Sequence, residues 1–249
     1  MRIPRIYDSK NFLNIDDFIQ LEDNAARHVG LVLRLEIGDK IIVFNNTGYD
    51  YLAEISEIQK KKISLKIIEK INITTESCLS IHLGQAVSRG EKMDWVIQKA
   101  VELGVKEITP VITQYTQAKA SEQKLEHWRK IIISACEQCG RNMMPVLHGA
   151  ANLSDWLNKI KISENKVNLI FEPEAVINLG SLDCFTSQKD AKLAMTLLIG
   201  PEGGFSSEEI TLSQQYCFQS VKLGNRILRT ETAAIAAISA LQTLAGDFR

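Results

Sequence analysis

The last fifth of the chain contains two apolar segments, each followed at once by a glycine-containing loop and then by a helical pattern. The first segment is 193–199 and leads into GPEGGF. The second is 221–223 and leads into LGNRILRTE. Two strand–loop–helix units in succession indicate an α/β sheet. Loops at the carboxyl ends of such strands commonly bind ligands, so this stretch predicts one small-molecule site.

The first loop, Gly200–Gly204, matches neither G-x-G-x-x-G nor a P-loop, because no Gly-Lys-Ser/Thr follows it. It contains Glu202, whose carboxylate repels phosphate but suits ribose hydroxyls or a cationic group. The helix after it has Ser206 as the expected N-cap and Glu209 as its capping-box partner, with Phe205 as a hydrophobic-staple residue. The alternative interpretation is a tight turn that binds no ligand.

The second loop places two guanidiniums, Arg226 and Arg229, just before a helix. Thr230 is the expected N-cap, and Glu231 suits the first turn of the helix dipole. From Ala233 the helix is nearly all Ala, Ile and Leu, so we expect it to be buried on most sides, in the core or against a partner subunit. The alternative role for Arg229 is structural pairing.

The chain before these loops has two patterns. The ranges 40–44, 49–58 and 63–68 read as strands and 23–35 as a helix, with Val29, Val32 and Leu33 on one face, which predicts a small β-barrel. Beyond residue 79, strands and helices alternate, which predicts a mostly parallel sheet covered on both faces.

GPEGGFSSEEI followed by LGNRILRTETAAIAA resembles the cofactor-binding end of the SPOUT RNA methyltransferases, and among them the enzymes that methylate N3 of uridine 1498 in 16S ribosomal RNA. Arg5–Tyr7 and 28–39 resemble the family's PUA-like RNA-binding domain, and parts of 92–105 and 137–145 resemble further family blocks. One departure is TQYT at 113–116, where the family usually has an Arg-Ser pair.

The resemblance implies an α/β fold of the SPOUT type, a mostly parallel sheet with a C-terminal trefoil knot, at residues 73–249. A PUA-like β-barrel that binds RNA would occupy residues 1–72. It also implies a homodimer, with 16S ribosomal RNA in the small ribosomal subunit as the macromolecular partner.

The resemblance further implies S-adenosylmethionine as the cofactor. The residues expected to bind it are Leu198, Ile199, Gly200, Pro201, Glu202, Gly203, Gly204, Leu223, Gly224, Ile227, Leu228, Arg229, Thr230 and Thr232. Uracil N3 is a poor nucleophile until its proton leaves, so a positioned arginine could stabilise the developing anion. We expect Arg229 to be catalytic with Arg226 as a further candidate, and Glu202 to be a proton acceptor or a cofactor clamp.

A net charge of −1 means that RNA binding would depend on local basic clusters. The candidates are Arg2, Arg5, His28, Arg34, Arg89, Lys92, Arg141 and Arg226, each of which could instead be a solvated surface charge. Two alternative functions remain: methylation of a ribose 2′-hydroxyl or a tRNA base by another member of the superfamily, and a non-catalytic RNA-binding assembly factor.

Five cysteines without a second pair at zinc-ligand distance predict free thiols, and we expect no metal. This includes the C-x-x-C at Cys136 and Cys139, which lies in a helical pattern. No apolar run approaches the roughly 18 residues of a membrane span. The first residues, MRIPR, lack the apolar core of a signal peptide. We therefore expect a cytoplasmic protein with no membrane partner.

Overall fold

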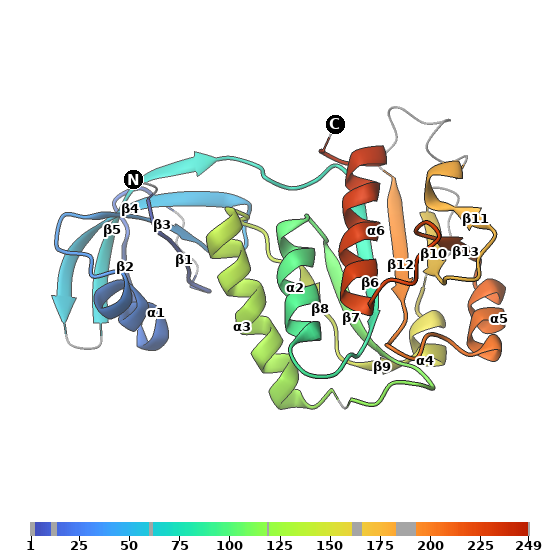
Figure 1. Cartoon of the computed structure of the whole chain (residues 1–249). Helices are drawn as coiled ribbons and strands as arrows, with labels where there is room; N and C mark the ends of the chain where they lie inside the picture. Colours follow the sequence, from blue (N-terminus) through green and yellow to red (C-terminus); the bar gives the residue numbers. More distant parts are fainter. Residues whose placement is uncertain are drawn as a thin grey trace. The chain divides into compact units, whose positions relative to one another are not determined.

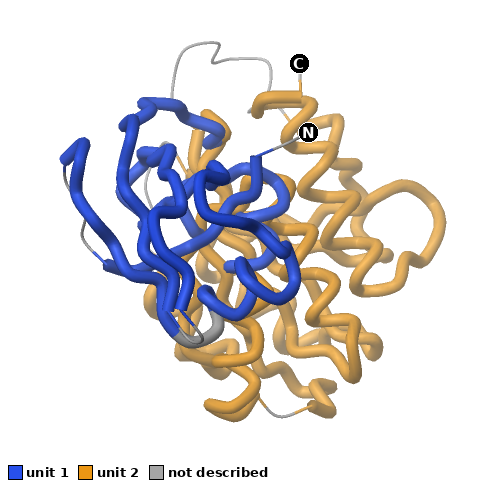
Figure 2. The backbone as a smooth tube through the Cα atoms, turned by 90° about the vertical axis from the view of Figure 1, so that its left-hand side faces the viewer, with its two compact units in different colours: residues 1–76, 133–144 blue, residues 77–132, 145–249 orange. Residues whose placement is uncertain are grey.

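The computed structural model describes residues 3–10, 14–59, 62–118, 120–160, 166–182 and 193–248. The chain forms two compact units, coloured blue and orange in Figure 2. Unit 1 contains residues 1–76 and 133–144, and unit 2 contains residues 77–132 and 145–249. The helix 122–139 therefore contributes its first part to unit 2 and its last turns to unit 1, which sequence periodicity does not reveal. The predicted boundary at residue 72 stays a prediction.

Unit 1 is built on a five-stranded sheet in the order β1-β3-β4-β5-β2. Its strands are β1 (Arg5–Tyr7), β2 (Phe18–Glu22), β3 (Lys40–Phe44), β4 (Tyr49–Gln59) and β5 (Lys62–Asn72). All neighbours are antiparallel except β1 and β3. Among the described residues no pairing joins β1 to β2, so the predicted barrel is an open sheet there.

Apolar residues at alternate positions of these strands form the core of unit 1. In β4, Tyr51, Ala53 and Ile55 are buried, and in β5, Ile63 and Leu65 are buried. Side chains of successive residues point to opposite faces, so every second residue is available to one core. The strand prediction for this region is confirmed.

The structure differs from the predicted helix at 23–35. This segment forms a short α-helix, α1 (Asp23–Arg27), followed by one π-helical turn, η1 (His28–Val32). Val29 is buried, but the side chain of Val32 is 65% exposed. A π-turn bonds residue i to i+5, as the Leu33 N–H does to the His28 carbonyl, and so the 3.6-residue spacing no longer aligns these apolar residues.

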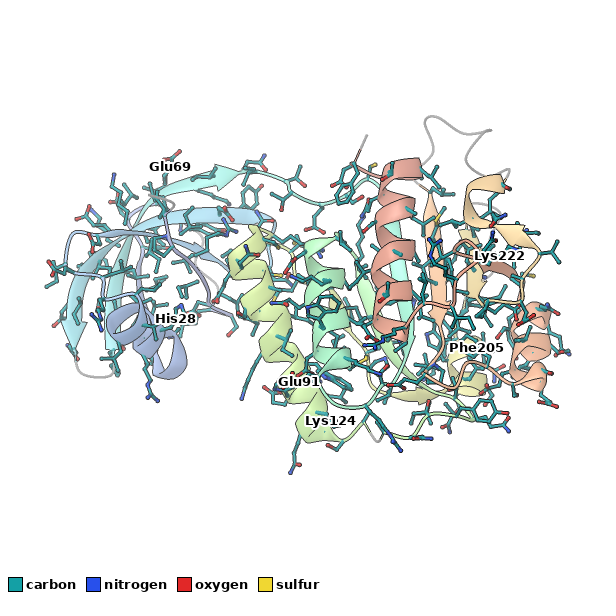
Figure 3. The ribbon with its side chains drawn as sticks, in the orientation of Figure 1. His28, Glu69, Glu91, Lys124, Phe205 and Lys222 are labelled. Atoms are coloured by element: carbon teal, nitrogen blue, oxygen red, sulfur yellow. The ribbon has the colours of Figure 1, made fainter. Side chains whose placement is uncertain are left out.

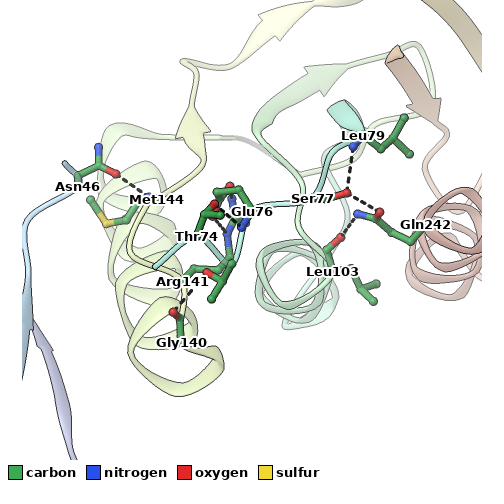
Figure 4. A network of polar contacts seen from close by, with 11 residues as sticks. Asn46, Thr74, Glu76, Ser77, Leu79, Leu103, Gly140, Arg141, Met144 and Gln242 are labelled. Carbon is green, nitrogen blue, oxygen red and sulfur yellow. Dashed lines mark hydrogen bonds and ion pairs between the residues drawn. The ribbon is translucent and has the colours of Figure 1, made fainter. Parts of the chain in front are cut away.

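Residues 133–144 are held to the sheet of unit 1 by polar contacts. Glu137 accepts a hydrogen bond from the Tyr7 backbone N–H at 3.1 Å. The Met144 N–H donates to Asn46 Oδ1 at 2.6 Å, which Figure 4 shows. These bonds explain why a segment distant in sequence belongs to this unit.

Unit 2 contains a parallel sheet with the path β11-β13-β10-β12-β6-β7-β8, and β9 also pairs with β7. Its strands are β6 (Ser80–Ala86), β7 (Glu107–Ile112), β8 (Val146–Leu147), β9 (Ala151–Asn152), β10 (Lys166–Phe171), β11 (Ile177–Asn178), β12 (Ala194–Ile199) and β13 (Phe218–Lys222). Every pairing among them is parallel. The predicted mostly parallel sheet is confirmed.

Helices cover both faces of this sheet (Figure 1). On one face, the buried Gln85 of β6 donates to Thr230 of α6 (Thr230–Ala245), which packs beside α2 (Lys92–Glu102). On the other face, a Cβ at Gly84 would come within 2.4 Å of the Trp156 ring of α4 (Leu153–Leu157), and α5 (Ser207–Gln215) packs beside α4. The other helices in the described ranges are α3 (Glu122–Cys139) and the short 3₁₀ turn η2 (Leu179–Ser181).

The end of α6 is anchored by a buried amide. Gln242 donates from Nε2 to the Leu103 carbonyl at 2.6 Å and accepts from the Ser77 hydroxyl at 2.7 Å (Figure 4). This side chain fixes α6 against the end of α2. Seven residues of α6 are buried and most of the others are half-exposed, so the helix is less enclosed than its composition predicts.

None of the described helices is long and apolar enough to cross a membrane. The trefoil knot expected from the resemblance stays a prediction.

Candidate cofactor site

A cavity of about 650 Å³ lies where the strands β10, β12 and β13 end. The sheet order places β10 between the other two, so the loops that follow all three strands meet at one edge. The volume is in the usual range for small-molecule sites. The cavity is lined by Lys92, Phe171, Glu172, Pro173, Glu174, Ile199, Gly200, Pro201, Glu202, Gly203, Gly204, Phe205, Ile210, Val221, Leu223, Gly224, Arg226, Ile227, Leu228, Arg229, Thr230 and Ala233.

The structure brings together all the residues predicted to bind the cofactor except Leu198 and Thr232. Leu198 is fully buried in the apolar cluster that contains Trp156. Thr232 is exposed on α6. In a strand, neighbouring side chains point to opposite faces, and this separates Leu198 from Ile199, which lines the cavity.

Sequence analysis missed the loop after β10, where Glu172, Pro173 and Glu174 line the cavity. The Glu172 N–H donates to the Val221 carbonyl at 3.1 Å, which places this loop beside β13. The sequence shows an apolar strand followed by Glu-Pro-Glu, but it does not show that this strand lies between β12 and β13 in the sheet. That strand order is what brings a third loop to the cavity.

Phe205, predicted to be only a staple residue, also lines the cavity (it is labelled in Figure 3). A Cβ at Gly200 would lie 3.1 Å from its ring, so glycine allows the loop to pass close to the aromatic side chain. The predicted capping box is confirmed: the Ser206 side chain accepts from the Glu209 N–H, and the Glu209 carboxylate accepts from the Ser206 N–H.

Thr230 joins the two predicted loops. Its hydroxyl donates to the Gly200 carbonyl at 2.6 Å and accepts from the Gln85 amide at 2.9 Å. Thr230 is the first residue of α6 and not its N-cap, because Arg229 occupies that position without a side-chain cap. The hydroxyl that was expected to cap the helix is used to hold the first loop.

The segment TQYT at 113–116, where the family usually has an Arg-Ser pair, lies against the loop Gly200–Gly204. A Cβ at Gly203 would come within 2.9 Å of Tyr115 Cβ, so the backbone approaches this tyrosine closely. The Gln114 N–H donates to Glu209 Oε1 at 2.7 Å. Gly204 adopts a φ of +72°, a conformation that glycine adopts without steric cost. Tyr115 and Glu209 thus help to shape the cavity loop.

Glu202 forms an ion pair with Lys92 of α2, with Nζ and Oε1 2.8 Å apart. Partial burial acts to raise the pKa of Glu202. The bond from Lys92 and backbone N–H donors, including that of Arg89, outweigh this effect and hold the pKa below its ordinary value. Glu202 is therefore an ionised carboxylate at neutral pH, suited to a cationic group and weak as a base.

Arg226 and Arg229 both line the cavity and both are exposed. Among the described residues, neither guanidinium has a hydrogen-bond or ion-pair partner. An arginine without a structural partner beside a cavity is available to an incoming ligand. Pairing of Arg229 with a helix C-terminus therefore has no support in the described part of the chain, and pairing with a partner subunit stays the alternative.

Two residues predicted to bind RNA are instead buried in ion pairs of unit 1. Arg5 makes a two-pronged contact with Asp50, one bond being Nη2 to Oδ1 at 2.9 Å, and both side chains are 6% exposed. Arg141 binds Glu76 through Nε at 2.9 Å and Nη2 at 2.6 Å (Figure 4). Buried charges are paired, so these arginines stabilise the fold.

The other RNA-binding candidates are distributed as follows. Arg34 and Arg89 are exposed, and Arg34 has a φ of +53°. His28, labelled in Figure 3, is half-buried. Arg2 lies outside the described residues.

The comparisons with known proteins agree with this geometry. The family model of an RNA methyltransferase domain matches residues 75–242, and that of an RNA methyltransferase PUA domain matches residues 21–68. The ribosomal RNA small subunit methyltransferase E of Buchnera aphidicola subsp. Schizaphis graminum is 43% identical over 99% of this chain and 98% of its own length. The chain belongs to the ribosomal RNA small subunit methyltransferase E family.

A further methyltransferase E sequence and two solved methyltransferase structures are similar to this chain over nearly its whole length. The enzyme of Rickettsia conorii is 31% identical over 98% of this chain and 97% of its own. The crystal structure of the Neisseria gonorrhoeae methyltransferase E bound to S-adenosylmethionine superimposes with a TM-score of 0.90 at 36% identity, covering all of both chains. A Legionella pneumophila methyltransferase with bound S-adenosylmethionine gives 0.92 at 39% identity, again covering all of both chains.

The cavity residues fit the cofactor seen in those relatives. S-Adenosylmethionine carries a sulfonium and an amine, and Glu172, Glu174 and Glu202 supply carboxylates along the lining. Apolar side chains such as Ile199 and Leu223 provide surface for a purine ring. The close approach of Gly203 to Tyr115 leaves no room for a larger residue in the loop. Membership of the methyltransferase E family thus agrees with the chemistry of the site.

Proposed function

We propose that this chain transfers a methyl group from S-adenosylmethionine to N3 of uridine 1498 in 16S ribosomal RNA of the small ribosomal subunit. The observation that carries the proposal is the cavity between three strand ends, with paired Glu202 and unpaired Arg229 on its wall. Similarity over the whole length to methyltransferases crystallised with this cofactor supports it.

The loops Gly200–Gly204 and Leu223–Thr230 and the loop after β10 hold the cofactor. Bound there, the cofactor supplies an electrophilic methyl group. The Thr230 hydroxyl fixes the spacing of the first two loops through the Gly200 carbonyl. Holding both reactants in line provides much of the rate enhancement, because it removes the entropy of encounter.

Arg229 is the proposed catalytic residue. Loss of the N3 proton to water would leave negative charge on the uracil ring. N3 would then bond to the methyl carbon as the bond between that carbon and the cofactor sulfur breaks, which leaves a neutral thioether. The Arg229 guanidinium at the cavity stabilises the negative charge on the ring. Because it has no partner among the described residues, no ion pair has to break before it acts.

Glu202 is proposed as a cofactor-side residue. Its lowered pKa, with Lys92 at 2.8 Å, makes it a poor acceptor for the N3 proton. Of the two roles predicted for Glu202, we propose the cofactor clamp.

RNA contacts are proposed for the exposed arginines Arg34, Arg89 and Arg226. Arg34 lies in the part of unit 1 matched by the PUA model, within residues 21–68. Exposed guanidiniums can bind phosphates in pairs of hydrogen bonds. The buried Arg5 and Arg141 are left out of this interface.

We also propose that the protein acts as a cytoplasmic homodimer. The support is the half-exposed apolar flank of α6 together with Trp95 on the neighbouring α2, which is 49% exposed. Sedimentation of the chain and of a Trp95→Glu variant tests this. The proposal expects a dimer that the variant weakens, and a monomeric parent would contradict it.

The function is tested with radiolabelled S-adenosylmethionine and small ribosomal subunits from cells that lack this protein. We expect one labelled nucleoside, 3-methyluridine, mapped to position 1498 by mass spectrometry. A label on a ribose hydroxyl or on a tRNA would contradict the proposal. Absence of any transfer despite cofactor binding would support an assembly factor instead.

Arg229→Ala separates catalysis from binding. We expect cofactor affinity by calorimetry to stay near the parent value while transfer falls by about 100-fold or more. Thr232→Ala, on the exposed side of the same helix, is the matched control and should transfer at the parent rate. Equal rates for Arg229→Ala and the parent would refute the catalytic assignment.

A further inference from the structure

Unit 2 contains a second group of chemically active side chains near the amino ends of β6 and β7. His82 lies in β6, Glu107 begins β7 and His148 follows β8. The cavity described above is at the carboxyl ends of β10, β12 and β13. In a parallel sheet these are opposite edges, so the second group belongs to no part of the proposed methyl-transfer site.

The three side chains converge. His148 Nε2 lies 2.8 Å from Glu107 Oε2, and His82 Nδ1 lies 4.0 Å from the same oxygen. The two imidazole rings are 5.4 Å apart between centroids. One ligand atom from each residue lies within 4.8 Å of the other two. Two nitrogens and one oxygen thus surround a small common space.

These distances suit one metal ion. Zinc binds nitrogen and oxygen at about 2.0–2.2 Å, so two of its ligands in a tetrahedron are about 3.4 Å apart. The separations of 2.8 and 4.0 Å fall on either side of this value. The side chain of His148 is 41% exposed, which gives it room for the small shift.

His82 has the surroundings of an oriented ligand. Its Nε2 lies 2.8 Å from the Thr109 hydroxyl, and Trp156 packs edge-on against its ring at 5.7 Å. A histidine whose other nitrogen is hydrogen-bonded is fixed in tautomer and direction. The Nδ1 atom is then the ring nitrogen that faces Glu107.

We propose that His82, Glu107 and His148 bind a divalent transition-metal ion of the zinc class. Two imidazoles and one carboxylate form a ligand set that zinc, cobalt and nickel accept, and the partly exposed site leaves a position for water. The ion bridges β6, β7 and the residue after β8. Its role is to stabilise the packing of these three segments against one another. The expectation of no metal from sequence is revised by this proposal.

The test uses the full chain without an affinity tag, freed of metal by a chelator. Calorimetric titration with zinc chloride should show one equivalent bound per chain, and cobalt(II) should give the visible absorption of a low-symmetry site. His148→Ala and Glu107→Gln should each weaken binding by about tenfold or more, and Thr109→Val by about tenfold. Added zinc should raise the melting temperature of the parent and not of His148→Ala.

His127→Ala is the matched control. His127 is an exposed histidine of α3 that pairs with Asp94 at 2.7 Å and not with this cluster. It should bind zinc as the parent does. Calorimetry with S-adenosylmethionine checks that every variant is folded, since the cofactor cavity is at the other edge. Failure of methyl transfer would leave these results unaffected.

Two outcomes overturn the proposal. One is the absence of saturable one-equivalent binding to the parent. The other is equal zinc affinity for the parent, His148→Ala and Glu107→Gln, which would place any bound ion elsewhere.

Discussion

The hydroxyl of Thr230 donates a hydrogen bond to the carbonyl of Gly200 at 2.6 Å, across 30 positions of sequence. The same hydroxyl accepts from Gln85 in the middle of the sheet. The first turn of α6 and the glycine loop after β12 are therefore held by one buried atom. The cavity depends on this atom for the spacing of two of its walls.

Thr230→Val keeps the shape of the side chain and removes both bonds. We expect the free energy of unfolding to fall by about 1–3 kcal/mol, because buried polar partners lose their hydrogen bonds. We also expect weaker binding of S-adenosylmethionine, measured by calorimetry. Thr232→Val, in the same helix but exposed, should change neither quantity. Identical cofactor affinity for both variants would show that the tie does not shape the cavity.

Gly203→Ala tests the close approach of the first loop to Tyr115. The added Cβ would lie 2.9 Å from Tyr115 Cβ, a separation that forces the backbone to move. Overpacking of this kind usually costs about 1–3 kcal/mol of folding stability. We also expect the shifted loop to bind the cofactor more weakly, as measured by calorimetry.

The double variant Gly203→Ala/Tyr115→Gly removes the opposing atom and should recover part of this affinity. Gly149→Ala, at a glycine with open space around its Cβ position, is the control for the substitution itself. No recovery in the double variant would mean that the steric explanation is wrong.

Arg5→Met tests whether this arginine belongs to the fold or to an RNA surface. Asp50 is 4% exposed and would be left buried without its charged partner. Such a loss costs about 3–5 kcal/mol, which chemical denaturation of the full chain would measure. Arg34→Met, at an exposed position, should leave stability unchanged.

Arg5→Met/Asp50→Leu replaces both charges by apolar groups and should recover most of the lost stability. Filter binding with a 16S ribosomal RNA fragment completes the comparison. We expect Arg34→Met to weaken RNA binding more than the double variant does. The reverse order would restore Arg5 to the RNA interface.

The reactivity of the cysteines provides a pH test. Burial raises the pKa of the Cys136 thiol to about 12, whereas Cys78 and Cys217 are exposed. Only the thiolate reacts, so alkylation at a pH of about 9 should modify the solvent-exposed cysteines first. Cys136 should stay unmodified in the folded chain. Rapid labelling of Cys136 in peptide maps would contradict this expectation.

The sequence by itself determined the local features of the site. The GPEGGF and LGNRILRTE loops, the capping box at Ser206 and Glu209, and the strand–helix alternation follow from glycine, capping and periodicity, which act within a few residues. It also placed Arg229 and Glu202 at one cavity. These features can be predicted from the sequence because the residues that interact in them are close to one another along the chain.

Only the tertiary structure decided which distant segments meet. The order of strands brought the Glu172–Glu174 loop into the cavity, and packing enclosed Arg5 with Asp50, 45 positions apart. The same sheet gathered His82, Glu107 and His148 from three strands. Whether a charged side chain faces solvent, a ligand or a buried counter-charge depends on the long-range packing around it, and no local pattern records that.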